Sequence, residues 1–233
     1  MYLSRVRFWP NNAAHQALIS VQQKGSYASH QLLWQLFTEQ ADRNFLFREE
    51  QASGLVGSQG MPEYLVLSTT APAQLSELFQ VQTKKFEPRL VVGERLAFRL
   101  RANPTVSYKG GSSDSTRGQR HDVMMHARKT AQASGIVDKQ QLQQQMDQAA
   151  IEWLTCEQRS AKLGVRFEVQ PTIIESSQHK TSKKSQSQLI SYSAVDYEGV
   201  LTVNEPELFL TQVALGLGRA KAFGCGLMLI RRV

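Results

Sequence analysis

The sequence predicts an α+β protein made of two tandem ferredoxin-like domains, at residues 1–92 and 93–233. The chain has 233 residues, which fits one large domain or two small ones, and its hydrophobic fraction of 41% can form a core. Strand-like and helix-like segments follow each other in the ferredoxin-like order of strand, helix, strand, strand, helix, strand. The same order recurs in the second half of the chain. The prediction depends on the order of elements and not on a repeated sequence.

In the first half, the spacing of apolar residues distinguishes strands from helices. Residues 1–9 alternate like a strand, and residues 11–26 are polar and loop-like. Ser26 or Ser29 can cap a helix that continues to about Glu39, with an apolar stripe at helical spacing. The remaining segments are expected strands at 44–49, 63–69 and 84–92, a turn-rich break at 54–60 and a short helix from Pro72 to Phe79.

In the second half, a strand at 94–102 comes first. Residues 104–139 are rich in Gly, Ser, Thr and charged residues, so we expect mostly loop there, with a helix near 123–133. Apolar residues from Leu142 to Trp153 mark one face of a helix that Gly164 can end. The remaining segments are paired strands at 165–174 and 189–203, a polar connection at 176–187, a short helix at 206–215 and a final strand at 227–230.

The net charge of +7 is concentrated in one region. Between Thr83 and Lys129 the chain has eleven Lys or Arg and four Asp or Glu, and the difference of seven equals the net charge of the whole chain. Such a concentration favours a nucleic-acid surface, and the alternative is a solvated face of a basic protein. The candidate RNA contacts in its second part are Lys109, Arg117, Arg120, Arg128 and Lys129.

The strand at 94–102 places every second residue on a basic face. That face has Arg95, Arg99 and Arg101, whereas the residues between them give an apolar face that joins a core. A row of arginines at this spacing suits the phosphates of a nucleic-acid backbone. The alternative is solvated arginine on an exposed sheet.

A glycine-rich segment precedes the last expected strand. Its basic residues Arg219 and Lys221 favour an anionic partner such as RNA. Glycine permits positive φ and close approach of the backbone to a partner, so the segment is either a phosphate-facing loop or a purely structural turn. Its spacing fits neither the dinucleotide-binding fingerprint nor the Walker pattern. The four glycines are Gly216, Gly218, Gly224 and Gly226.

Tyr27 and His30 are candidates for acid–base chemistry. They lie three residues apart at the start of the first helix, so their side chains share one side of it. The positive end of the helix disfavours imidazolium, and a neutral imidazole can act as a general base or, once protonated, as an acid. The alternative is a packed histidine, because His30 shares a face with Trp34 and Phe37.

Other function classes lack their sequence signatures. No His, Cys, Asp and Glu cluster has metal-ligand spacing, so we expect no metal and no cofactor. No nucleophile elbow or paired-carboxylate signature is present. Cys156 and Cys225 are far apart and are expected to be buried, reduced thiols. No segment has the apolar length that a membrane span needs, and the N-terminus lacks a signal-peptide apolar region, so we expect a cytoplasmic protein without a membrane partner.

Six short motifs are spread over nearly the whole chain. In their order and separations, they resemble the CasE family, the CRISPR repeat-processing endoribonucleases of the type I-E Cascade complex. The motifs are Met1-Tyr-Leu-Ser4, Ser29-His30-Gln31-Leu32-Leu33-Trp34-Gln35-Leu36-Phe37, Asn44-Phe45-Leu46-Phe47, Phe98-Arg99-Leu100-Arg101-Ala102-Asn103-Pro104, Tyr197-Glu198-Gly199-Val200-Leu201 and the glycine-rich segment.

The resemblance implies a fold, an activity and partners. The fold is a tandem ferredoxin-like (RRM-like, RAMP) arrangement. The activity is metal-independent cleavage of precursor CRISPR RNA at the base of the repeat stem-loop, with His30 catalytic and Tyr27 as its helper. The 2′-hydroxyl attacks the adjacent phosphate, which gives a 5′-hydroxyl on one product and a cyclic or 3′ phosphate on the other. The partners are the repeat RNA hairpin and the other Cascade subunits, in antiviral defence.

Two alternatives to an endoribonuclease stay open. One is a non-catalytic RNA-binding subunit of the same fold, in which His30 only packs. The other is a basic structural subunit that contacts protein alone. Cleavage separates the first alternative from the enzyme, and salt-dependent RNA binding separates the second, because phosphate contacts make binding strongly dependent on salt.

Overall fold

The structure is a computed structural model that describes residues 1–24, 26–37, 44–51, 62–108, 119–183 and 186–233. Contacts between residues divide the chain into two compact units. The first unit comprises residues 1–89, 213–216 and 220–227, and the second comprises residues 90–212, 217–219 and 228–233. The boundary between residues 89 and 90 therefore lies close to the predicted boundary between residues 92 and 93. Most of the glycine-rich segment, however, groups with the first unit and not with the second.

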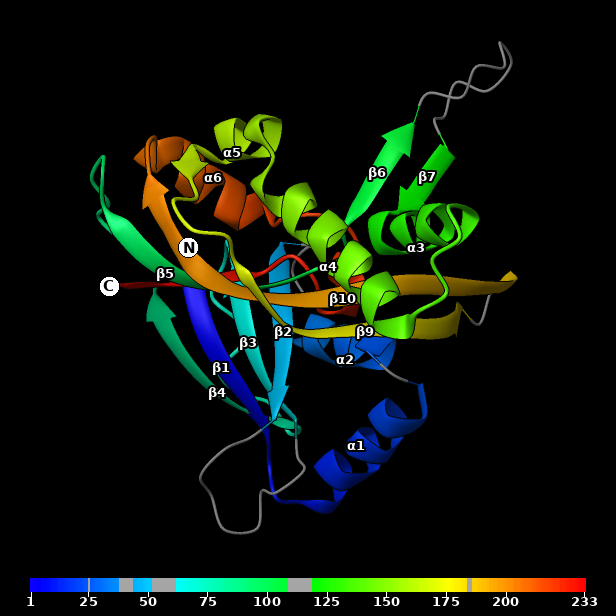
Figure 1. The fold of residues 1–233 in the computed structure, drawn as a ribbon. Coiled ribbons are helices and arrows are strands. Elements are labelled where there is room, and N and C mark those ends of the chain that lie inside the picture. The colour runs from blue at the N-terminus through cyan, green and yellow to red at the C-terminus, as the bar shows by residue number, and fades with distance from the viewer. Residues whose placement is uncertain (25, 38–43, 52–61, 109–118, 184–185) are drawn as a thin grey trace. The chain divides into compact units, whose positions relative to one another are not determined.

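The first unit contains a four-stranded antiparallel sheet (Figure 1). Its strands are β1 (Tyr2–Phe8), β2 (Phe45–Gln51), β3 (Pro62–Ser68) and β4 (Phe79–Lys85), in the order β2-β3-β1-β4. The first strand is central because it pairs with both β3 and β4. This is the ferredoxin-like strand order, so the predicted fold class is confirmed.

The polar segment after β1 is helical, and its prediction as a loop is wrong. Helix α1 spans Asn12–Lys24. Asn11 caps its N-terminus, because the Asn11 side-chain oxygen accepts a hydrogen bond from the Ala14 backbone N–H at 2.8 Å. Ala14, Leu18 and Val21 are buried at helical spacing, which gives the helix a narrow apolar face. The many polar residues between them hide this face from a reading of composition.

The helix expected from Pro72 to Phe79 is absent, and this prediction is wrong. Residues 69–78 run without helix or strand, and Phe79 already belongs to β4. Ser76 holds the end of this segment, because its hydroxyl oxygen accepts from the backbone N–H groups of Leu78 and Phe79. The expected strand at 84–92 is wrong for most of its length, since β4 ends at Lys85.

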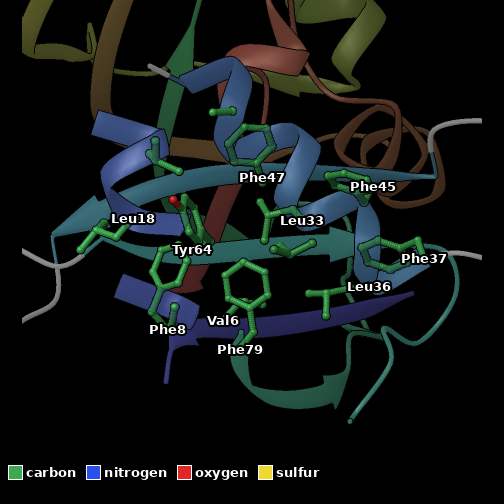
Figure 2. Close-up of a cluster of buried hydrophobic side chains, with 14 residues drawn as sticks. Val6, Phe8, Leu18, Leu33, Leu36, Phe37, Phe45, Phe47, Tyr64 and Phe79 are labelled. Atoms are coloured by element: carbon green, nitrogen blue, oxygen red, sulfur yellow. The ribbon is translucent and has the colours of Figure 1, made fainter. Parts of the chain in front are cut away.

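Helix α2 (Ser26–Trp34) and the 3-10 helix η1 (Gln35–Phe37) pack onto the sheet of the first unit. Figure 2 shows side chains from these helices and from the strands meeting in one core. Leu33 contributes from α2, Val6 from β1 and Phe47 from β2, each with no exposed surface. Fully burying such a side chain contributes about 1.5–3 kcal/mol relative to leaving it exposed, so the core fixes α2 on the sheet.

The second unit has the same strand order. Strand β5 (Arg95–Ala102) lies between β11 (Met228–Arg232) and β10 (Gln186–Val203), which also pairs with β8 (Val165–Arg166) and β9 (Thr172–Lys183). All these pairs are antiparallel. The predicted strand at 94–102 is confirmed, and the later segments pair as predicted. The single strand predicted at 165–174 is instead interrupted at 167–171, and the predicted polar connection at 176–187 is wrong for most of its length, because residues 176–183 extend β9 and pair with β10.

Helices follow β5 and cover one face of its sheet. Helix α4 (Lys139–Thr155) buries Trp153 and Leu154, and its Ala150 carbonyl accepts a hydrogen bond from the Tyr197 hydroxyl of β10. Helix α4 was predicted to end at Gly164, but it ends at Thr155, and Gly164 with a φ of 68° ends the separate helix α5 (Glu157–Leu163). Helix α6 (Pro206–Leu215) has the predicted bounds.

Residues 104–139, the basic insertion, contain more secondary structure than predicted. Strands β6 (Thr105–Tyr108) and β7 (Gln119–Asp122) form an antiparallel pair, and α3 (Val123–Ala133) follows with Asp122 as its N-cap. The helix was predicted, whereas the strand pair was not. Within the described ranges, no helix combines the length and the apolarity that a membrane crossing requires.

Candidate active site

Helix α2 places Tyr27 and His30 on one side of the first unit. The helix begins at Ser26, so both residues lie in its first two turns. Ser29 and Leu33 have no exposed surface and hold the helix against the sheet. Tyr27 and His30 are half-buried, and their ring centroids lie 6.1 Å apart at an interplanar angle of 26°. The sequence-predicted pair is therefore brought together as a stack.

Further aromatic rings surround His30. Its ring centroid lies 5.5 Å from that of Phe45, nearly parallel to it, and 5.5 Å from that of Trp34, edge to face. Phe47 is the next neighbour, at 6.2 Å. These contacts restrict the rotation of the imidazole. The same restriction is expected for a catalytic histidine and for a histidine that only packs. The two interpretations of His30 therefore differ in chemistry and not in packing.

A chain of hydrogen-bonded polar side chains passes through Ser29, the residue just before His30. The Tyr64 hydroxyl donates to the Ser29 hydroxyl at 3.1 Å, and Ser29 donates to the Glu49 carboxylate at 3.2 Å. Burial, and then the nearby charge of Glu49, raises the pKa of Tyr64 well above its ordinary value. Tyr64 therefore stays a donor, and the chain ties α2 to strands β2 and β3. Sequence reasoning missed this network because its members lie on three separate elements.

The glycine-rich segment lies against the same helix. The 3-10 helix η2 (Lys221–Phe223) brings Phe223 to Tyr27, with ring centroids 5.9 Å apart. Gly216 has a φ of 75°, which favours glycine, and a β-carbon there would lie 2.7 Å from the Leu46 side chain and 3.2 Å from the Gly226 carbonyl oxygen. The part of the segment around Phe223 therefore lies next to Tyr27. Phe223 carried no sequence signal beyond being an aromatic residue between glycines.

The backbone of the segment confirms the expected positive φ angles. The four predicted glycines have φ between 75° and 99°, and Ala220 shares this region at 57°. The Lys221 ammonium donates to the Leu215 carbonyl at 2.5 Å, where it caps the C-terminal end of α6. Arg219 is exposed and pairs through its backbone with Asn103 in the second unit. The two predicted cations of the segment therefore have different surroundings.

The arginine row on β5 alternates as predicted but is largely matched by acids. Arg101 holds Asp196 through several hydrogen bonds, the shortest at 2.6 Å, and Arg99 forms an ion pair with Glu198. Both acids lie directly across from their arginines on β10. Two of the three arginines in the row therefore have acidic partners within their own sheet. Arg95 is exposed at the start of the strand.

The face of the sheet that has these ion pairs also contains a hollow. A depression of about 710 Å³ lies on it, lined in part by Arg99, Glu198 and Arg231. Its other lining includes apolar side chains of the same sheet, among them Ile174 and Leu229. The charge on this face is mixed and the surface is partly apolar. The hollow therefore indicates phosphate binding less specifically than a row of arginines alone would.

Only some of the candidate RNA-binding residues in the basic insertion have side chains that the structure describes. Arg128 and Lys129 are exposed on α3. Arg120 lies in β7, where only its backbone is described, and Lys109 and Arg117 lie outside the described residues.

The two cysteines differ in their exposure. Cys225 is buried as expected, whereas Cys156 is exposed at the start of α5, so that part of the prediction is wrong. Both are free thiols. Across the part of the chain that the structure describes, no three His, Cys, Asp or Glu side chains are grouped closely enough to hold a metal ion.

Similarity to known proteins extends over the whole chain. The model of the CRISPR associated protein family matches residues 1–232. The CRISPR system Cascade subunit CasE of Escherichia coli (strain K12) is 28% identical over 233 residues, which cover 98% of both chains. The CRISPR-associated endoribonuclease Cse3 of Thermus thermophilus is 31% identical over 194 residues, which cover 82% of this chain and 81% of Cse3.

Solved structures agree with the sequence matches. Thermus thermophilus Cse3 bound to an RNA representing a pre-cleavage complex has a TM-score of 0.69 and 26% identity, with 99% of this chain and 98% of that chain covered. Cas6e of Escherichia coli K-12 has a TM-score of 0.61 and 26% identity, with full coverage of both chains. The strand order, the motifs and these matches agree, and the chain belongs to the CRISPR-associated protein family that includes CasE and Cse3.

Proposed function

We propose that this protein is an endoribonuclease that cleaves precursor CRISPR RNA within the repeat, at the base of its stem-loop. It then stays bound to the hairpin as a subunit of Cascade. The observation that supports this best is the stacked Tyr27–His30 pair on α2. It occurs in a chain similar to an endoribonuclease, Cse3, whose solved structure contains RNA.

The reaction needs two proton transfers, which the pair can supply. A base removes the proton of the 2′-hydroxyl as its oxygen forms a bond to the adjacent phosphorus. An acid protonates the 5′-oxygen as the P–O5′ bond breaks, which leaves a 5′-hydroxyl and a cyclic phosphate that water can open to a 3′ phosphate. His30 fits either role because imidazole exchanges protons near neutral pH, and Tyr27 assists as a hydroxyl donor beside it.

RNA binding is assigned to the exposed basic side chains. Arg95, Arg128, Lys129 and Arg219 are exposed, and several phosphate contacts of this kind make binding strongly dependent on salt. Lys109, Arg117, Arg120, Arg99, Arg101 and Lys221 stay candidates from the sequence. Of these, Arg99, Arg101 and Lys221 would first have to leave partners within the protein.

The proposal includes cleavage without a metal ion, in the cytoplasm. The substrate supplies its own nucleophile, and the charge that develops on the phosphate can be stabilised by basic side chains. Excess chelator should therefore leave the cleavage rate unchanged. Complete inhibition by chelator, reversed by a divalent cation, would contradict this part of the proposal.

The deciding experiment is single-turnover cleavage of one cognate repeat RNA by His30→Ala. We expect the rate constant to fall by about 10²-fold or more, because a general acid–base group contributes about that much, while the Kd for RNA stays within a few-fold. His15→Ala is the matched control, since His15 is an exposed histidine on α1.

The rival is a non-catalytic RNA-binding subunit, in which the aromatic rings around His30 serve packing alone. Under that rival, the wild-type protein would bind the hairpin without cleaving it, and His30→Ala would lower stability alone. Cleavage by wild-type protein that persists in His30→Ala would instead show that another residue performs the chemistry.

A further inference from the structure

We propose that the glycine-rich segment orients Tyr27 for catalysis, with Phe223 as the positioning residue. This inference rests on the proposed function, because it needs Tyr27 to take part in cleavage. It differs from the interpretation of the segment as an RNA-binding loop, since it assigns the segment to the chemical step. Phe223 touches Tyr27 and is not itself placed at the reacting atoms.

The first observation is the place of Tyr27 beside two rings. The ring of His30 lies 6.1 Å away between centroids, and the ring of Phe223 lies 5.9 Å away with an interplanar angle of 41°. A half-buried tyrosine with only one neighbour could take other side-chain rotamers. The ring of Phe223 limits these alternatives and leaves the phenol beside the imidazole.

The second observation is the rigid construction of the turn that presents Phe223. Ala220 and Gly224 bound η2 on its two sides, and both have left-handed backbone angles. The Ala220 carbonyl accepts from the Phe223 N–H at 2.8 Å and from the Cys225 N–H at 3.4 Å. A non-glycine residue in this region is strained, and such strain persists where the surrounding structure fixes the conformation.

The third observation is how the segment is anchored. The segment lies against β2: a β-carbon at Gly216 would be 2.7 Å from the Leu46 side chain, and one at Gly224 would be in ordinary contact with the ring of Phe47 at 3.4 Å. Leu46 and Phe47 belong to β2, whose Phe47 also neighbours His30. The Lys221 ammonium, held by the Leu215 carbonyl, fastens the turn to the end of α6. One strand therefore supports both the imidazole and the turn that contacts Tyr27.

These contacts give the segment a role that can be separated from RNA binding. A group that grips RNA changes the Kd and its salt dependence. A group that orients a catalytic side chain changes the rate constant at saturation, because misplacement by about 1 Å can cost as much as 10²-fold. The exposed Arg219 and the half-buried Phe223 lie close together in the chain and should show these opposite effects.

The test measures single-turnover cleavage and binding of one synthetic repeat hairpin that the wild-type protein cleaves. Phe223→Ala should lower the rate constant at saturating protein by about 10- to 100-fold, with the Kd within a few-fold of wild type. Phe223→Tyr should keep most of the rate, because it retains the ring. Arg219→Ala should weaken binding and reduce its salt dependence, with little change in the saturated rate.

A double-mutant comparison identifies the route of the effect. If Phe223 acts through Tyr27, Phe223→Ala added to Tyr27→Phe should cost much less than it costs alone. Urea unfolding of each variant checks that it folds. If Phe223→Ala does not fold, Phe223→Leu replaces it, because leucine retains much of the side-chain volume but has no aromatic ring to pack against Tyr27. Independent, additive losses would overturn the inference.

Other outcomes separate this inference from the proposed function. A normal rate in Phe223→Ala, together with an inactive His30→Ala, would overturn the positioning role and leave the nuclease intact. A normal saturated rate with a much weaker Kd would show that the segment grips RNA, which also overturns it. Full cleavage by His30→Ala would instead contradict the proposed catalytic residue.

Discussion

In the first unit, the helix α2 that packs on the sheet is short, and it presents a histidine among aromatic rings. In the second unit, the helix that covers the sheet is 17 residues long, buries Trp153 and Leu154, and has a glutamine-rich exposed side. Both units share one strand order. The comparison teaches that the chemistry here depends on side chains placed on a common framework, not on the framework itself.

The two sheets share cross-strand ion pairs and differ in what ties a helix to them. On the second sheet, Arg99 and Arg101 are met by acids directly across the neighbouring strand, and on the first sheet Arg7 meets Glu63 in the same way. In the first unit, the polar chain from Tyr64 through Ser29 to Glu49 ties the helix of His30 to two strands and fixes its position. Disturbing the first unit should therefore change the chemical step, whereas disturbing the second should change binding.

The largest expected effect comes from equal truncations of the two cores. Leu33 in α2 and Leu154 in α4 are both completely buried, so Leu33→Ala and Leu154→Ala should each lower the free energy of unfolding by about 2–5 kcal/mol. Only Leu33→Ala should also slow cleavage at saturating RNA, measured at a temperature where both variants are folded. Equal losses of cleavage rate in the two variants would break the comparison.

A smaller effect is expected at the ion pair between Arg101 and Asp196. Removing either partner should cost about 1 kcal/mol of stability or less, because the pair is partly exposed. Asp196→Ala frees a cation, so hairpin binding should strengthen and its salt dependence should steepen, whereas Arg101→Ala should do neither. Binding titrations at several salt concentrations measure this, and identical salt slopes for both variants would show that this face does not meet RNA.

The smallest effect is a pH dependence from His179 in the second unit. Burial, and then the positive charge of Arg101, lowers the pKa of His179 below its ordinary value of 6.5. The unfolded chain then binds the proton more readily than the folded one, so stability should fall as the pH drops below about 6.5. Urea midpoints at about pH 7.5 and about pH 5.5 should therefore differ more in wild type than in His179→Gln. An equal change in both proteins would rule out this contribution.

Much of the framework could be predicted because its signal is local. The alternation along β5 and the apolar spacing along α4 define their faces within a few residues, and α6 has the expected bounds. Helix α1 was missed because its buried positions Ala14, Leu18 and Val21 lie among polar residues. The expected helix after Pro72 fails because a proline permits a helix start but does not require one.

The site could be predicted only in part, for a physical reason. Tyr27 and His30 share one helix, so their spacing alone indicates that they meet. The acids that face Arg99 and Arg101 come from a strand far along the chain, and their register is decided by the fold. Phe223 meets Tyr27 across an even longer gap in the chain, where no local pattern signals contact.

The division of the glycine-rich segment between the units also sets an order of events during protein synthesis. Residues 220–227 complete the first unit but leave the ribosome after nearly all of the second unit has been made. A nascent chain can therefore form the sheet around His30 early, yet it lacks Phe223 beside Tyr27 until translation is almost finished. Maturation of the active site is thereby delayed to the end of synthesis, and fragments that stop at the end of the first long segment should lack competence for catalysis.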